Sequence, residues 1–424
     1  MTEMTESGVW QDVPSPFCGI ASDDLKIKID GLNVSVIENG DTVTKKGFET
    51  PISDTSPRIE GKKVSLDEAI NYIVNVLRES KQPVIGGMAT DLNGARSVMA
   101  LADKSRATID NMDSAASFRN TLVLQDTGWM ITTLTEVRNR VDLLLVVGSD
   151  IEAEYPRFFE RMVWNNESMF GQDIESRQVI YLGKAPSGEA STSPKGKKAQ
   201  VLACEEADLP EVVAILRALV KGKTIQADQV GGIAVDDLAV LAEQLKQAKY
   251  SVVTWAAGHL DFDHAEATVQ TVCEMIKELN EETRSSGLPL GGKDGGITVN
   301  QVSAWQSGYP MRTTFNQGYP DYDPYLCDTN RMLENGEVDT LIWVSSFNID
   351  RTPPQSNAKT IVLGRSGMRF EYEPDVFIPV GTPGIDHAGR AFRTDGVVSV
   401  PLRKLRDSGL PSTFDVLTAV EQAL

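Results

Sequence analysis

The spacing of hydrophobic residues changes along the chain, and this change predicts how the fold is organised. Apolar and polar residues alternate over Leu25–Ile29 and Leu32–Val36, as in half-buried strands, and Asp30-Gly31 between them predicts a hairpin turn. Ser65-Leu66-Asp67-Glu68 is then a capping box, after which apolar residues recur at helical spacing. We therefore expect a small β-rich region over residues 1–60, followed by domains that contain helices.

Short apolar runs typical of buried strands recur through the rest of the chain, and helical patterns separate most of them. Strands are expected at 83–87, 107–109, 141–147, 179–182, 250–255, 339–344, 360–363 and 376–379. Helices are expected at 66–77, 91–104, 133–140, 208–221, 235–248, 263–284 and 412–423. Because strands and helices alternate, the fold class is α/β, with parallel, doubly wound sheets.

Residues 285–330 depart from this alternation of strands and helices, because they hold few periodic elements and many glycines, prolines and aromatic residues. Two related strings stand out, Gly308-Tyr309-Pro310 and Gly318-Tyr319-Pro320. A non-periodic segment of this length in a compact chain is usually functional or part of an interface. We expect either a wall of a ligand cleft or a packed surface loop.

The charge balance narrows the range of partners. The 424 residues carry a net charge of −19, which argues against nucleic acid or an anionic membrane as the main partner. No apolar run approaches the ~20 residues of a transmembrane helix, and Met1–Glu6 lacks the features of a secretory signal. Without a C-x-x-C pair, the cysteines are expected to be free thiols in a reducing cytoplasm.

The turns that follow the predicted strands are candidates for a ligand site, because open α/β sheets bind ligands beyond the carboxyl ends of their strands. The candidates at this edge are Gly87, Ser149, Asp150 and Gly258. None of these turns carries the G-x-G-x-x-G fingerprint, so a nicotinamide cofactor is not supported.

Loop arginines of the second half offer a second kind of site. Guanidinium groups suit carboxylates and phosphates, so Arg312, Arg351 and Arg365 would form an anion site if they shared one cleft. The alternative is a set of scattered surface ion pairs.

The string His259-Leu260-Asp261-Phe262-Asp263-His264 is the one local cluster of histidines and aspartates. Its side chains could bind a metal ion, although the spacing matches no closed zinc pattern. The alternative is that Asp263 caps the following helix and that His259 and His264 lie at the surface.

The N-terminal stretch Ser15-Pro16-Phe17-Cys18-Gly19-Ile20-Ala21-Ser22 has the spacing of an iron–sulfur loop with most of its sulfurs missing. A C-x-x-C-x-x-x-C pattern would place cysteines at 15, 18 and 22, whereas only Cys18 is present. Serine is a poor ligand for a soft iron–sulfur core, so the loop is predicted to be metal-free.

Several strings together resemble the B subunit of formylmethanofuran dehydrogenase, a molybdopterin oxidoreductase. They are Pro16-Phe17-Cys18-Gly19 with Asp23-Asp24, the strings Gly308-Tyr309-Pro310 and Gly318-Tyr319-Pro320, and Gly384–Gly396. The resemblance covers nearly the whole chain.

The resemblance implies a layout like that of formate dehydrogenase and DMSO reductase. Residues 1–60 would be a degenerate iron–sulfur domain, and 61–130 plus 331–424 a discontinuous Rossmann-like domain. Residues 131–330 would form a second Rossmann-like domain inserted into it. The family's C-terminal pterin-binding barrel is expected to be absent.

The departures from the family concern its metal ligands. The family's cluster ligands fall at Ser15, Cys18, Ser22 and Thr44, and its tungsten or molybdenum ligand falls at Ala116, after Asp110-Asn111. One thiolate does not hold a four-iron cluster, and alanine has no donor atom. We expect no catalytic residue, no bound metal, and no iron–sulfur or pterin cofactor in this chain.

This combination resembles the B subunits of formyltransferase/hydrolase complexes, and therefore implies a non-redox scaffold. The implied partners are a formyltransferase subunit, an amidohydrolase-like zinc hydrolase subunit and a β-helix-like subunit. Together they would convert formyl-tetrahydromethanopterin to formate through a methanofuran-type carrier, in formaldehyde oxidation. The alternatives are a tungsten or molybdenum dehydrogenase with unusual ligands, or a subunit whose arginines bind the carrier's acidic tail.

Overall fold

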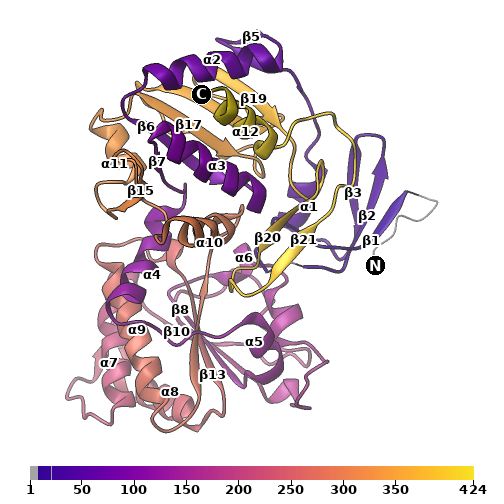
Figure 1. The fold of residues 1–424 in the computed structure, drawn as a ribbon. Coiled ribbons are helices and arrows are strands. Elements are labelled where there is room, and N and C mark those ends of the chain that lie inside the picture. The colour runs from indigo at the N-terminus through magenta and orange to yellow at the C-terminus, as the bar shows by residue number, and fades with distance from the viewer. Residues whose placement is uncertain (1–7, 21) are drawn as a thin grey trace. The chain divides into compact units, whose positions relative to one another are not determined.

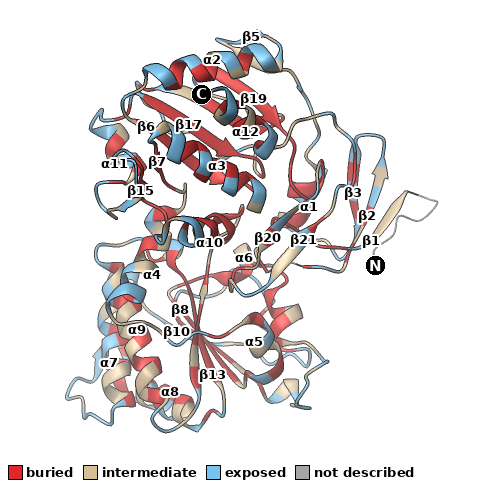
Figure 2. Ribbon diagram, viewed as in Figure 1, coloured by how far each residue is buried: buried red, intermediate tan, exposed pale blue. Residues whose placement is uncertain are grey.

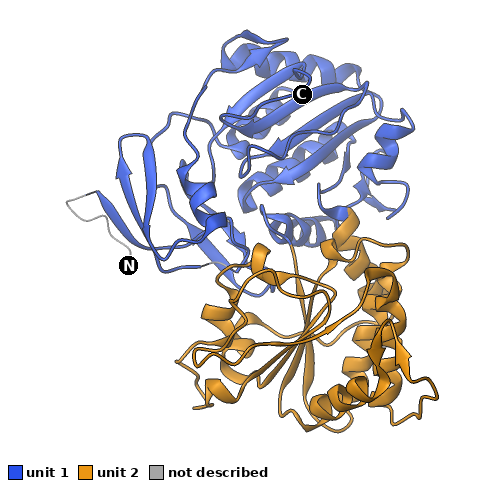
Figure 3. Cartoon of the chain, turned by 180° about the vertical axis from the view of Figure 1, so that it is seen from behind, with its two compact units in different colours: residues 1–114, 292–424 blue, residues 115–291 orange. Residues whose placement is uncertain are grey.

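The computed structural model describes residues 8–20 and 22–424, so the stretch Met1–Glu6 considered for a signal lies outside the described residues. The chain forms two compact units, which Figure 3 shows in different colours. Unit 1 comprises residues 1–114 and 292–424, and unit 2 comprises residues 115–291. None of the helices in the described part of the chain has the length and apolar character needed to cross a membrane.

The N-terminal part of unit 1 is an antiparallel sheet in the order β1-β2-β3. Its strands are β1 (Val9–Val13), β2 (Leu25–Asp30) and β3 (Asn33–Glu38). The predicted hairpin is confirmed, since β2 and β3 pair across the turn at Gly31. A helix that the sequence pattern did not predict follows, α1 (Thr42–Glu49), whose N-terminus is capped by Asp41.

The main sheet of unit 1 has nine strands in the order β16-β15-β7-β6-β17-β18-β19-β4-β5. They are β4 (Arg58–Ile59), β5 (Lys62–Lys63), β6 (Pro83–Ala89), β7 (Thr108–Ile109), β15 (Thr313–Thr314), β16 (Asp321–Tyr322), β17 (Thr340–Ser345), β18 (Lys359–Arg365) and β19 (Val376–Val380). The five central strands are parallel, as predicted, and the strands at both edges are antiparallel.

Helices cover this sheet and supply its core. They are α2 (Leu66–Glu79), α3 (Leu92–Ser105), α10 (Gly296–Ser307), α11 (Thr329–Glu334) and α12 (Thr413–Ala423). The predicted capping box at Ser65 is present at the start of α2, and Ser412 forms a second one at the start of α12. Apolar residues of α2, α3 and α12 pack in one core with the parallel strands, which Figure 2 shows as buried. A further hairpin joins β20 (Gly389–Phe392) and β21 (Ser399–Leu402).

Unit 2 is built on a fully parallel sheet in the order β10-β9-β8-β13-β14. Its strands are β8 (Leu143–Val147), β9 (Gln178–Gly183), β10 (Gln200–Ala203), β13 (Ser251–Ala256) and β14 (Ser285–Leu290). Its helices are α4 (Ser114–Asp126, which begins in the last residue of unit 1), α5 (Leu134–Arg140), α6 (Ile151–Glu154), α7 (Leu209–Val220), α8 (Val235–Gln247) and α9 (Ala265–Leu279), and a small hairpin joins β11 (Gln229–Val230) and β12 (Ile233–Ala234). The strand order reverses between β8 and β13, which is where such a sheet offers a ligand crevice.

The expectation of a largely non-periodic segment at 285–330 is wrong. Residues 285–290 form β14, residues 296–307 form α10, and β15 and β16 complete one edge of the nine-stranded sheet. The pattern failed there because α10 lacks a one-sided apolar stripe, and the two edge strands are two residues long.

The limits of the compact units differ from the expected domain limits of 61–130 plus 331–424 and 131–330. The inserted part runs from Ala115 to Gly291, and residues 292–330 belong to unit 1. The physical reason is that α10 packs on α3, while β15 pairs with β7 of the large sheet. A separate N-terminal domain of residues 1–60 stays a prediction.

Candidate functional site

The four positions at which the resemblance predicts former cluster ligands lie close together in unit 1. Ser15, Cys18 and Ser22 come from the loop between β1 and β2, and Thr44 comes from the first turn of α1 (Figure 1). All four side chains are buried. The backbone N–H of Ser15 donates to the carbonyl of Ser22 at 2.8 Å, which ties the two ends of the loop together. The fold therefore brings together Ser15, Cys18 and Ser22, which share the spacing of the loop, and Thr44, which the resemblance added. Their role as former cluster ligands stays a prediction.

These four side chains contact one another directly, in two pairs. The hydroxyls of Ser15 and Thr44 lie 3.2 Å apart, and the Cys18 thiol donates to the Ser22 hydroxyl at 3.6 Å. The Ser22 N–H also donates to the Cys18 sulfur at 3.2 Å. Four-iron clusters are held by four cysteine thiolates. One thiol and three hydroxyls that bond to one another in pairs therefore do not fit such a group.

Apolar packing surrounds the loop at Phe17. The Phe17 ring lies against the backbone of Gly47, where an added Cβ would come within 2.4 Å of the ring. Phe17 also makes edge-to-face contacts with Phe48 and Phe347, at centroid distances of 5.2 and 6.1 Å. The loop is thus held by apolar contacts and hydrogen bonds.

Arg365, one of the predicted anion-binding residues, is part of this packing. It is buried, and its guanidinium donates to the carbonyls of Gly47 at 2.6 Å and Phe347 at 2.7 Å. The same group lies over the Phe17 ring, 5.7 Å from its centroid. Burial lowers its pKa to about 10, which still leaves it charged at neutral pH. Arg365, at the end of β18, therefore contacts both α1, at Gly47, and the N-terminal loop, at Phe17.

Arg312, the second predicted arginine, forms a buried ion-pair cluster elsewhere in unit 1. Its guanidinium pairs with Asp328 and lies 3.7 Å from Asp110, and it donates to the Ser114 hydroxyl. Burial raises the pKa of Asp110 to about 6, although the charge of Arg312 acts in the opposite direction. Sequence reasoning did not single out Asp328, whose partner lies 16 positions away.

Arg351, the third arginine, is the most accessible of the three. It pairs with Asp113 and also contacts the Met112 sulfur. Nearby, burial raises the pKa of Asp294 to about 6, against the effect of Arg351. The three arginines therefore have different internal partners, and their role in binding an anion stays a prediction.

The sequence pattern predicted that the strand ends in a turn at Gly87, and this prediction is wrong. β6 continues to Ala89, and Gly87 and Met88 both have positive φ at an irregularity in the pairing with β17. A Cβ on Gly87 would lie 2.6 Å from the carbonyl oxygen of Val344. Glycine is required there by close strand packing, and Gly87 is buried within the sheet.

The remaining candidates gather in unit 2 at the carboxyl ends of β8 and β13. The Ser149 hydroxyl accepts from the N–H of Ala256 at 2.9 Å, and Asp150 caps α6. Ala116, from the first turn of α4, has its Cβ 3.8 Å from where a Cβ would lie on Gly258. Ala116, the residue that the resemblance assigns to a metal-ligand position, is therefore next to the point where the strand order reverses.

The two histidines of the string His259–His264 have different partners in the folded chain. His259 pairs with Glu154 at 3.1 Å, whereas His264 is exposed and lies 3.4 Å from Glu266. Asp263 does not cap the following helix, because His264 occupies the capping position with positive φ. Across residues 8–20 and 22–424, no group of three or more histidine, cysteine, aspartate or glutamate side chains could hold a metal ion.

Comparisons with known proteins identify relatives of this chain. No family model matches the chain. The B subunit of the tungsten-containing formylmethanofuran dehydrogenase 2 of Methanococcus maripaludis is 27% identical over 414 residues, 94% of each chain. The Fhc B subunit of the formyltransferase/hydrolase complex of Methylorubrum extorquens is 26% identical over 333 residues, 77% of this chain and 85% of that one. The chain is a homologue of these B subunits.

Solved structures show the same fold for this B-subunit homologue. The crystal structure of the Methylorubrum extorquens complex FhcABCD with methylofuran matches with a TM-score of 0.72 and 23% identity. That match covers 87% of this chain and 98% of the other. Acetylene hydratase from Pelobacter acetylenicus matches with a TM-score of 0.62 and 7% identity, over 97% of this chain and 69% of the enzyme.

Proposed function

We propose that this B-subunit homologue is a non-redox structural component of a formyltransferase/hydrolase complex in one-carbon metabolism. The observation that carries the proposal is the N-terminal loop, where Ser15 bonds to Thr44 and Cys18 bonds to Ser22. A side chain without a donor atom, Ala116, at the second metal position supports it. The two metal centres of a redox relative would thus have lost their ligands independently.

The chemistry of the proposed complex is compatible with these losses. Transfer of a formyl group from formyl-tetrahydromethanopterin to a methanofuran-type carrier, and its hydrolysis to formate, moves no electrons. Partner subunits would supply the reactions: a formyltransferase, an amidohydrolase-like subunit with zinc, and a β-helix-like subunit. The proposed compartment is the cytoplasm, where the free thiols Cys18, Cys204, Cys273 and Cys327 would stay reduced.

Metal analysis of the assembled complex tests this proposal. The chain is purified with its natural partners under anaerobic conditions, and iron, sulfide, tungsten and molybdenum are measured per copy of the chain. We expect these elements to be far below stoichiometric, while the complex releases formate from formyl-tetrahydromethanopterin. Stoichiometric tungsten or molybdenum together with iron in this chain would overturn the proposal.

The second candidate function is a tungsten or molybdenum dehydrogenase with unusual ligands. It is favoured by the tungsten-containing relatives of Methanococcus maripaludis and Methanocaldococcus jannaschii, each of which aligns with 94% of this chain. The same purified complex distinguishes the two functions. A dehydrogenase would oxidise the formyl-carrier with an artificial electron acceptor, and the proposed scaffold complex would release formate without reducing that acceptor.

The third candidate is binding of the carrier's acidic tail by loop arginines. Among the three, Arg351 gives the most interpretable variant, because Arg312 and Arg365 are buried and hold other parts of unit 1. We compare the carrier affinity of the complex with Arg351→Gln and without it. An unchanged affinity, with an unchanged melting temperature, would argue against a role of Arg351 in carrier binding.

A further inference from the structure

The two Gly-Tyr-Pro strings of the sequence lie at one edge of unit 1, around the hairpin of β15 and β16 (Figure 1). Gly308-Tyr309-Pro310 precedes β15, and Gly318-Tyr319-Pro320 leads directly into β16. Four of the nine tyrosines of the chain fall within this short segment, namely Tyr309, Tyr319, Tyr322 and Tyr325. The proposed function leaves this gathering of tyrosines unexplained.

Large side chains of this segment are exposed. Tyr319 is 60% exposed, Tyr325 71% and Leu326 55%. The Tyr309 ring stacks on the Tyr322 ring, with 5.7 Å between their centroids, and Tyr309 is still 41% exposed. Tyrosine is enriched in protein–protein interfaces, and clustered exposed apolar side chains mark binding surfaces. Tyr309, Tyr319, Asp321, Tyr325 and Leu326 are called the tyrosine edge below.

Hydrogen bonds to the backbone hold one end of the tyrosine edge in place. The Asp323 carboxylate accepts from the N–H groups of Tyr325 at 2.8 Å and of Leu326 at 2.7 Å. The Arg331 guanidinium donates to the carbonyls of the same two residues, at 3.1 and 2.6 Å. A surface that is ordered before binding loses less conformational entropy when a partner binds. The exposed side chains of Tyr325 and Leu326 therefore project from a backbone that is already fixed.

The charge of the segment favours a cationic partner. The only basic residue in the range 305–330 is Arg312, which is buried and paired with Asp328. Asp321, by contrast, is exposed, and none of the residues that the structure describes forms an ion pair with it. The tyrosine edge thus presents a carboxylate and no exposed cation of its own.

Arg331 shows how this surface binds a guanidinium. Its guanidinium lies over the Tyr325 ring, 5.6 Å from the centroid, and pairs with Glu337 at 2.7 Å. An aromatic ring and a carboxylate are the two groups that suit arginine best, because its planar guanidinium both stacks and forms ion pairs. Tyr319 and Asp321 expose the same two groups to solvent.

We propose that the tyrosine edge is a docking surface for an arginine-bearing surface of another subunit of the same complex. The Asp321 carboxylate pairs with a cation of that subunit, and the tyrosine rings pack against its guanidinium groups and their apolar stems. A second copy of this chain is a poor occupant, because each copy carries a net charge of −19. That the partner is a component of the complex rests on the proposed function.

Site-specific photo-cross-linking in the intact complex tests the proposal. A benzophenone amino acid replaces Tyr319, and in a matched control it replaces Tyr372, an exposed tyrosine of unit 1 outside the tyrosine edge. We expect the Tyr319 position to cross-link to a peptide of another subunit that has an arginine or lysine within a few residues of the linked site. The Tyr372 position should give no link to that peptide.

The other outcomes of the cross-linking each overturn a proposal. If the chain purifies with its partners but the Tyr319 position links to none of them, the docking proposal is wrong and the proposed function stands. Links to a second copy of this chain, or to a segment without basic residues, would also overturn the docking proposal. If the chain purifies alone, the proposed function fails and the docking proposal fails with it.

A charge reversal supplies an independent measurement. Asp321→Lys and a control, Asp103→Lys, make the same change of charge at two exposed positions of unit 1. We expect Asp321→Lys to bind the partner subunits roughly tenfold more weakly, with a loss that diminishes at high salt because charge repulsion causes it. Asp103→Lys should bind them as the native chain does, and both variants should keep its melting temperature. Equal affinities of the two variants would contradict the proposal.

Discussion

At the scale of single residues, a few buried polar side chains hold unit 1 together around the N-terminal loop. The hydroxyls of Ser15 and Thr44 form a hydrogen bond with each other, and the Cys18 thiol donates to the Ser22 hydroxyl. The Arg365 guanidinium donates to the backbone carbonyls of Gly47 and Phe347. A buried guanidinium that donates to two carbonyls is stabilising only while both bonds are made. Arg365 therefore has a structural explanation that does not depend on a ligand.

Replacing Arg365 with leucine tests this explanation. The variant leaves the carbonyls of Gly47 and Phe347 unpaired, which should lower the free energy of unfolding by about 2–3 kcal/mol. Thermal unfolding of the isolated chain measures the effect, with Arg369→Leu as the control because Arg369 is exposed. Equal melting temperatures for both variants would show that Arg365 is not needed for stability.

A second prediction at this scale concerns pH. The folded-state pKa of Asp110 is about 6, mainly because of burial, and its ordinary value is 3.8. The folded chain therefore binds more protons than the unfolded chain between these values, and this group makes the chain less stable as pH rises through that window. We expect Asp110→Asn to gain stability relative to the native chain between about pH 4 and pH 6. A constant difference in melting temperature across that range would contradict the prediction.

At the scale of elements, α1 depends on its first turn more than on its composition. The Asp41 carboxylate accepts from the Thr44 N–H at 2.7 Å and from the Thr44 hydroxyl at 3.0 Å. It thus caps the helix and orients the hydroxyl that contacts Ser15. The first turn of α1 therefore carries a helix cap that is linked to the N-terminal loop through Thr44.

Removing the cap that Asp41 provides should destabilise α1. We expect Asp41→Ala to lower the free energy of unfolding by about 1–2 kcal/mol. Asp41→Asn should cost much less, because asparagine also caps helices well. Denaturant unfolding of the two variants side by side gives the comparison. A similar loss of stability for both variants would indicate that the negative charge of Asp41 stabilises α1 more than its capping hydrogen bonds do.

At the scale of the whole molecule, the inserted unit has what an independent domain needs. Residues 115–291 contain a complete five-stranded parallel sheet and a core formed by its own strands and helices. The large buried residues of this core, such as Trp255 and Leu241, contact partners within the unit. Enough apolar surface is buried within a single continuous segment for it to be stable alone.

A fragment of residues 114–291, which keeps α4 whole, is therefore expected to fold by itself. It should show a cooperative thermal transition and a dispersed amide NMR spectrum. Its Leu241→Ala variant should melt at a lower temperature, since a buried leucine replaced by alanine typically costs about 2–5 kcal/mol. A fragment that is unfolded in both forms would show that the unit requires the rest of the chain.

The sequence alone determined the α/β class, most strands and helices of both units, and the three spaced positions of the N-terminal loop. These followed from local periods, capping residues and a spacing of 15, 18 and 22, which are properties of neighbouring residues. The donor atoms at the predicted ligand positions were also visible there, because the chemistry of a side chain is known from its residue type, and the loss of metal ligands at these positions stays a prediction.

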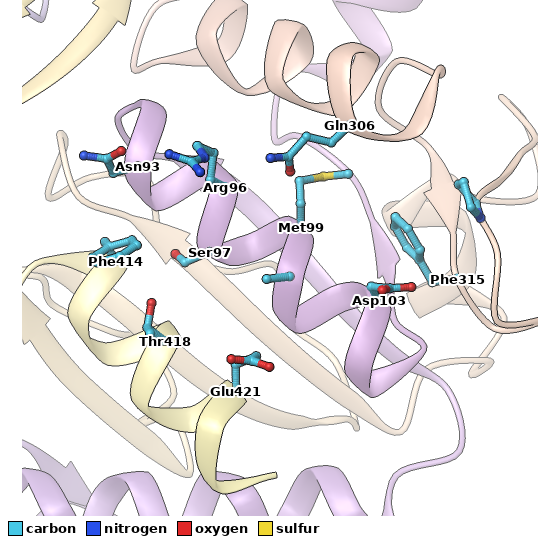
Figure 4. A pocket seen from close by; sticks show the side chains of 12 residues that line it. Asn93, Arg96, Ser97, Met99, Asp103, Gln306, Phe315, Phe414, Thr418 and Glu421 are labelled. Atoms are coloured by element: carbon cyan, nitrogen blue, oxygen red, sulfur yellow. The ribbon is translucent and has the colours of Figure 1, made fainter.

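Only the tertiary structure decided the rest, since it depended on residues distant in sequence. The pairing of β15 with β7 placed residues 292–330 in unit 1, and no local period reports such a contact. Arg312 and Arg365 proved to be buried with different partners, 16 and 318 positions away. The pocket shown in Figure 4, which α3, α12 and Phe315 line, is likewise formed by three distant segments of the chain.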